Sequence, residues 1–213
     1  EAQPIMQSAR ELIRSLDPQA IVIPGNHDFI DYKSTSPVEL LNLYQEIFGV
    51  ESMRSCRELG AYTLITLPSV EIVGGELRYI GRIAERELTW LRAELSKIPP
   101  ERPIILLLHM PLFTLTFQRR EGAVAGTLPT KVVTNNRELI EAFTGKRLLL
   151  VLQGHLHVNE FLRWEETTFI TGGALCGRWW EGANMGTNAG FGIVTLRGER
   201  VEWEYQSFLE KIT

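Results

Sequence analysis

The sequence predicts a mixed α/β layer fold, in which helices alternate with buried strands and a run of hairpins follows. Amphipathic spacing predicts helices over residues 4–16, 38–48, 85–97 and 137–144. Continuous apolar runs predict strands buried on both faces over residues 20–23, 104–108 and 146–152. Further strands are expected over residues 61–67, 70–73, 77–80, 158–164, 167–171, 191–196 and 200–206.

Proline and glycine mark the ends of the elements in the first part of the chain. Pro4 suits the first turn of the first helix, and Pro18 stops that helix. The strand over 20–23 ends just before Gly25. Pro37 begins the second helix, and Gly49 ends it.

The middle of the chain has a long irregular stretch between its predicted strands. The third helix carries Leu88 and Leu95 on its apolar face. Residues 110–134 contain several glycines and prolines with weak periodicity, and a loop of this length is often a lid or a substrate-facing insertion. Asn135 or Asn136 is expected to cap the helix over 137–144.

Composition excludes several classes of protein. The 213 residues carry a formal net charge of −4, so no global attraction to nucleic acid or to an anionic membrane surface is expected. No apolar run is long enough to span a membrane. Because no linker divides the chain, one domain over residues 1–213 is expected.

Two cysteines and the first residues bear on the compartment. Cys56 and Cys176 could form one long-range disulfide, but two buried thiols are the favoured interpretation. Residues 1–20 show no signal peptide, but the chain begins with Glu1 rather than Met. The compartment therefore stays open, with the cytoplasm favoured.

All four histidines follow the ends of predicted buried strands. His27 lies in GNHD, His109 in LLLHMP, and His155 and His157 in GHLH. Ligands of open α/β sheets bind at the carboxyl ends of the strands, so these side chains could converge. Imidazole and amide donors suit Zn, Fe, Mn or Co, and two ions about 4 Å apart would suit such a site.

Each motif also has an ordinary structural explanation. GNHD alone could be a turn with local hydrogen bonds, and His109 alone could be a buried core histidine. An extended His-x-His segment would point its rings to opposite sides, whereas a turn would aim both at neighbouring positions. The joint pattern favours a metal site, because no histidine lies elsewhere in the chain.

With these residues, the chain resembles the calcineurin-like metallophosphoesterase superfamily, and its phosphodiesterase-like branch in particular. That family has, in order, DxH, GD, GNH[D/E], an isolated His after a strand, and GHxH. The chain matches the last three motifs, and Met110-Pro111 after His109 is a common family form. The resemblance implies a layered αββα metallophosphoesterase sandwich.

The resemblance also implies roles for single residues. Metal ligands would be Asn26, His109 and His155 for the second ion and His157 for the first. His27 would contact the phosphate and protonate the leaving oxygen, with Asp28 supporting its ring. A metal-bound hydroxide at the binuclear site would then hydrolyse a small phosphodiester or phosphomonoester.

The chain departs from the family pattern at its beginning. It contains neither DxH nor GD, the motifs that supply two ligands of the first ion and the bridging carboxylate. We expect an N-terminally truncated domain with an incomplete site, weak or absent metal binding and little activity. Without the corresponding strands, an exposed sheet edge is expected to favour homo-oligomers.

A Gly-rich and aromatic segment supplies a secondary candidate. Arg178 could contact the substrate phosphate, and it is followed by Trp179 and Trp180, for which core packing is the alternative. The pair Arg119-Arg120 is interpreted as solvated rather than as a phosphate clamp.

Two functions of different classes remain at this point. The first is a metal-dependent phosphoesterase, and the second is a non-catalytic chain that keeps the fold for binding or assembly. A nuclease is disfavoured, because the chain is acidic and has no basic stripe.

Overall fold

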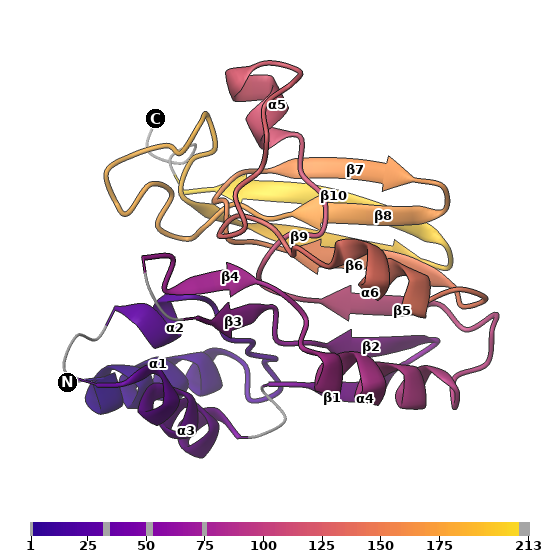
Figure 1. The fold of residues 1–213 in the computed structure, drawn as a ribbon, viewed down its shortest axis with the longest axis horizontal. Coiled ribbons are helices and arrows are strands. Elements are labelled where there is room, and N and C mark those ends of the chain that lie inside the picture. Colours follow the sequence, from indigo (N-terminus) through magenta and orange to yellow (C-terminus); the bar gives the residue numbers. More distant parts are fainter. Residues whose placement is uncertain (1, 32–34, 50–52, 74–75, 209–213) are drawn as a thin grey trace.

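A six-stranded mixed sheet lies at the centre of the computed structural model, which describes residues 2–31, 35–49, 53–73 and 76–208. Its strand order is β1-β2-β5-β6-β8-β7 (Figure 1). The strands are β1 (Ser55–Leu59), β2 (Tyr62–Thr66), β5 (Ile104–Leu107), β6 (Leu148–Gln153), β7 (Glu160–Trp164) and β8 (Thr167–Thr171). The inner strands β2, β5, β6 and β8 are parallel, and the two outer strands are antiparallel to their neighbours.

The inner strands are buried because both faces of the sheet are covered. On one face, α4 (Glu85–Leu95) and α6 (Asn136–Ala142) pack through a core that includes Leu88, Ile104 and Leu139. On the other face lies an antiparallel pair, β9 (Gly190–Arg197) and β10 (Arg200–Ser207). Its residues Val194 and Trp203 pack against the buried side chains of the sheet.

Three helices and a small hairpin complete the fold beside this sandwich. The helix α1 (Ala2–Leu16) packs with α2 (His27–Ile30) and α3 (Pro37–Phe48) around a second apolar cluster (Figure 1). Ser36 and Glu39 form a reciprocal capping box at the start of α3. The hairpin consists of β3 (Val70–Ile72) and β4 (Tyr79–Gly81). No helix of the described residues is long and apolar enough to cross a membrane.

The predicted α/β class is confirmed, but the predicted strand over residues 20–23 is wrong. Residues 20–25 form no ladder with any described strand, although their apolar side chains partly pack. A strand exists only through hydrogen bonds to a neighbouring backbone, which an apolar run cannot supply by itself. The sequence also left β1, α2 and α5 (Thr116–Glu121) unpredicted.

Two side-chain predictions need correction as well. Asn135 precedes α6 without capping it, because its amide group instead bonds the backbone N–H and carbonyl of Ile83 at 3.0 and 2.9 Å. Cys56 and Cys176 are both free thiols, and both are half-buried rather than buried.

Candidate metal centre

The parallel pair β5 and β6 brings two of the predicted sites together. His109 follows β5, and the N–H of Gly154, just after β6, donates to the carbonyl of His109 at 2.9 Å. The hydroxyl oxygen of Ser69 accepts from the N–H groups of His109 and Met110 at 3.1 and 2.8 Å. These bonds fix the backbone at the carboxyl ends of both strands.

The GHLH segment is a turn. The φ angles of His155 and His157 are 70° and 56°, which is the left-handed region, and the N–H of Leu156 donates to the carbonyl of Gly154 at 2.8 Å. Of the two conformations left open by the sequence, the structure has the turn. A non-glycine residue in this region is strained, and such strain is concentrated at functional sites.

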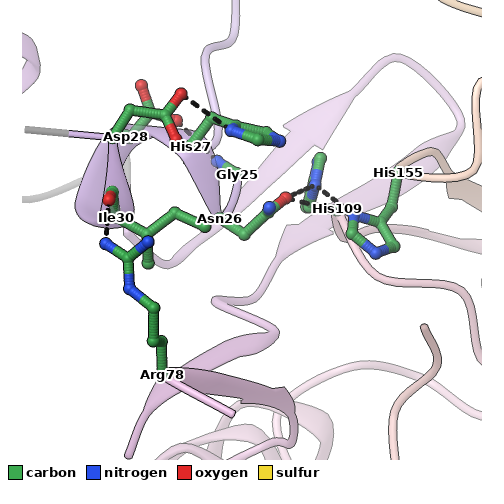
Figure 2. Close-up of polar contacts among 9 residues, drawn as sticks. Gly25, Asn26, His27, Asp28, Ile30, Arg78, His109 and His155 are labelled. Carbon is green, nitrogen blue, oxygen red and sulfur yellow. Dashed lines mark hydrogen bonds and ion pairs between the residues drawn. The ribbon is translucent and has the colours of Figure 1, made fainter. Parts of the chain in front are cut away.

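Three predicted ligands converge on one point. Asn26 Oδ1 lies 3.0 Å from His109 Nε2 and 3.1 Å from His155 Nδ1, and the two ring nitrogens are 3.2 Å apart (Figure 2). Ligands about 2.1 Å from one ion and at right angles to each other would be about 3.0 Å apart. The amide oxygen and two imidazole nitrogens therefore fit three ligands of one divalent ion.

Second hydrogen bonds set the protonation of the rings. His155 Nε2 lies 2.9 Å from the carbonyl oxygen of Thr130, so Nε2–H donates and Nδ1 keeps its lone pair toward Asn26. His157 Nδ1 lies 2.8 Å from the carbonyl oxygen of Gly177 and donates to it, which leaves Nε2 with a lone pair. Both rings thus present a nitrogen able to bind a metal.

Burial keeps the rings of His109 and His155 neutral. It lowers the pKa of His109 to about 3, with further lowering by the charges of the neighbouring histidines. Burial also lowers the pKa of His155 to about 4, opposed by the bond to Thr130 and assisted by the positive charge of Lys131. Neutral imidazole is the metal-binding form, so both rings are ready for coordination at neutral pH.

The GNHD turn is built around Gly25. Asp28 Oδ2 accepts from the N–H of Gly25 at 2.7 Å, and burial raises the pKa of Asp28 while this bond opposes the rise. A Cβ atom at Gly25 would lie 2.9 Å from Cε1 of His109. Glycine is therefore needed here for the close approach of the ring, and neither Gly25 nor Gly154 has a positive φ.

The carboxylate beside His27 is Asp31. His27 Nδ1 lies 2.8 Å from Asp31 Oδ2, whereas the Asp28 carboxylate is turned to the backbone of Gly25. Asp28 is the residue expected to orient the His27 ring, but in the structure Asp31 makes that contact. The guanidinium of Arg78 donates to the carbonyl of Ile30 and ties α2 to the β3–β4 hairpin (Figure 2).

His157 contacts the carbonyl oxygen of Gly177 and the ring of Trp179. The ring of Trp179 is 4.7 Å from that of His27, edge to face, and 5.5 Å from that of His157. Trp179 thus connects GNHD with GHLH, and at 53% exposure it is no core residue. Among the described residues, no group of three or more His, Cys, Asp or Glu side chains is arranged to hold a metal.

An open cleft of about 380 Å³ lies over these residues. Its lining includes His27, His155, His157 and the predicted substrate residue Arg178. The guanidinium of Arg178 is 58% exposed and lies 3.8 Å from Glu181. The cleft is thus open to solvent where Arg178 lines it.

Comparison with known proteins agrees with these motifs. The family model described as calcineurin-like phosphoesterase matches residues 4–159. The chain belongs to the calcineurin-like phosphoesterase family. Members of this family typically use a site with two metal ions. No curated protein matches the sequence.

Solved structures include one with a similar fold. A dimetal phosphatase from Danio rerio superposes with a TM-score of 0.60 at 13% identity, over 97% of this chain and 78% of that one. A 5′-nucleotidase-like structure from Staphylococcus aureus has a TM-score of 0.48 at 15% identity, over 93% of this chain and 39% of that one. At 13% identity, the match to the Danio rerio structure shows a similar fold and nothing about activity.

Sequence reasoning missed several residues of this site. Asp31 stands four residues after His27, a spacing that places both side chains on one side of a helical turn. Thr130 and Lys131 lie in the long irregular stretch, where no pattern distinguishes them. Arg120 lines the cleft, whereas the sequence suggested only a solvated pair.

Proposed function

We propose that the protein is a metal-dependent hydrolase of small phosphodiesters or phosphomonoesters. The observation that carries this proposal is the convergence of Asn26 Oδ1, His109 Nε2 and His155 Nδ1 within 3.2 Å of one another. We assign these three side chains to one metal ion and His157 to the other.

The residues of the chain would act around the reacting phosphate. A pair of bound metal ions supplies an activated nucleophile and neutralises phosphoryl charge. His155 is held by its hydrogen bond to the carbonyl of Thr130, and His109 by close packing of its ring against Gly25. His27, which is exposed on the cleft and bonded to Asp31, donates a proton to the leaving oxygen. Arg178, which lines the same cleft, contacts a phosphoryl oxygen.

A second candidate is a binding or assembly protein that has the fold without a working metal pair. The observation in its favour is that no acidic side chain of the described residues joins the histidines in a metal-binding group. The sequence likewise contains no DxH motif. A working metal pair would need further ligands besides Asn26 and the histidines of the described residues.

Metal stoichiometry and hydrolysis separate the two candidates. The purified protein is dialysed, its metal content is measured, and release of p-nitrophenol from the mono- and bis-p-nitrophenyl phosphates is followed with Mn, Zn, Fe and Co. We expect one ion per chain, at Asn26, His109 and His155, because a single assigned ligand, His157, is too few to retain the second ion through dialysis. Hydrolysis of neither ester by the metal-loaded protein would favour the binding function.

Variants at Asn26 provide the matched control. Asn26→Leu removes the converging oxygen at similar size, and Asn26→Asp replaces it with a carboxylate that still binds metal. We expect Asn26→Leu to lose the ion and Asn26→Asp to keep it. Equal metal content in both variants would contradict the assignment of Asn26 as a ligand.

A further inference from the structure

The cleft over the metal-binding residues has cationic side chains without acidic ones. Its described lining residues include Arg120, Lys131 and Arg178 and no aspartate or glutamate. Arg178 lies near Glu181, but Arg120 and Lys131 form no ion pair with any described residue. The positive charges of Arg120 and Lys131 repel each other and a bound metal ion, and an anion between the two side chains relieves this repulsion.

Arg120 is held over the cleft by the position of α5. Glu160 on β7 accepts from the hydroxyl of Thr114 and from the N–H of Leu115, both at 2.7 Å, just before the helix begins. Thr116 is buried at the first turn. The helix is thus anchored at one end, and its exposed Arg120 lines the cleft while its neighbour Arg119 does not.

Lys131 is placed by the metal-binding residues themselves. It directly follows Thr130, whose carbonyl oxygen accepts from the ring of His155 at 2.9 Å. The N–H of Lys131 donates to the carbonyl of Leu128 at 2.9 Å and closes a turn there. Half-buried Lys131 is therefore the residue next to the carbonyl group that bonds the His155 ring.

We propose that Arg120 and Lys131, here called the basic wall, bind a second anionic group in the organic part of a phosphate ester. This inference rests on the proposed function and narrows its substrate class to esters that carry a carboxylate or a further phosphate. The metal-binding residues take the reacting phosphate, and the basic wall takes the second charge.

Stable phosphonates test the basic wall without hydrolysis. The probes are 4-carboxybenzyl phosphonate, its neutral analogue 4-carbamoylbenzyl phosphonate, and 4-phosphonobenzyl phosphonate, each titrated calorimetrically in the presence of Mn²⁺. We expect the carboxy compound to bind about fivefold to tenfold more tightly than the carbamoyl compound, and less so at high salt. A larger gain with the phosphono compound identifies a second phosphate as the group, and an equal or smaller gain identifies a carboxylate.

The charge variants Arg120→Gln and Lys131→Gln should each reduce the preference for the carboxy compound over the carbamoyl compound. The double variant should bring that preference below about twofold. Arg119→Gln is the matched control, because Arg119 is another exposed cation of the same helix and does not line the cleft. Its preference should equal that of the unchanged protein.

Other outcomes overturn one proposal or the other. Equal binding of the charged and neutral phosphonates, no binding of either, or a preference that survives the double variant would reject the basic wall. A preserved preference in a protein that hydrolyses no phosphate ester would reject the phosphoesterase proposal and leave the basic wall standing as an anion site.

Discussion

The backbone of Gly25 lies directly against the ring of His109: a Cβ atom added at Gly25 would be 2.9 Å from Cε1 and 3.1 Å from both ring nitrogens. Such a distance is shorter than real Cβ contacts, so the ring or the turn would have to move. The same ring holds Nε2 within 3.0 Å of Asn26 Oδ1. Glycine in GNHD therefore positions a ligand that lies 84 residues further along the chain.

Gly25→Ala should consequently disturb both folding and metal binding. We expect a loss of about 1–3 kcal/mol in the free energy of unfolding from overpacking, and at least about tenfold weaker binding of Mn²⁺. Urea unfolding and calorimetric titration measure the two effects. Gly126→Ala is the control, because a Cβ there meets nothing within 4 Å. Equal effects of the two substitutions would contradict this role of Gly25.

The two aspartates of the GNHD region should behave differently. Asp28→Ala leaves the N–H of Gly25 without its acceptor and should cost about 1–2 kcal/mol of stability, whereas Asp28→Asn keeps an acceptor oxygen and should cost less. Asp31→Ala removes only the partner of the exposed His27 ring, so it should reduce hydrolysis with little change in stability. A larger unfolding effect at Asp31 than at Asp28 would reverse this assignment.

The strands and ligand motifs could be predicted because they depend on local patterns. Apolar runs gave β5 and β6, and their parallel pairing then brings His109 and His155 to one edge. The strand over 20–23 failed, since it requires a partner backbone rather than an apolar run. The basic wall could not be predicted, because Arg120 and Arg119 are equivalent in sequence and only the anchor of α5 distinguishes them.

Metal-free protein should lose stability as the pH falls below about 6.5. The pKa values of His109 and His155 are lowered to about 3 and about 4, so the folded protein keeps these rings neutral while the unfolded chain binds protons near 6.5. Stability from these rings is complete above pH 6.5 and is lost progressively down to about pH 4 for His155 and about pH 3 for His109, at up to about 1.4 kcal/mol per pH unit for each ring.

Urea midpoints at pH 7.5, 6.5, 5.5 and 4.5, with chelator present, measure this slope. His109→Gln removes one of the two rings, so its slope over this range should be shallower than that of the unchanged protein. An unchanged slope in the variant would show that His109 is protonated alike in both states.

The outer edge of β9 should make the chain associate with itself. In the described part of the structure the two-stranded sheet of β9 and β10 pairs with no further strand, and Phe191 and Ile193 on β9 are 45% and 42% exposed. An open edge with apolar side chains favours pairing with a second chain. We expect the molecular mass from light scattering to rise with concentration.

Ile193→Lys should weaken association by about tenfold, since burial of such a side chain contributes about 1.5 kcal/mol or more. Val124→Lys, at a loop residue that is 99% exposed, is the charge-matched control and should associate like the unchanged protein. A protein that stays monomeric at all concentrations would reject the edge as an interface.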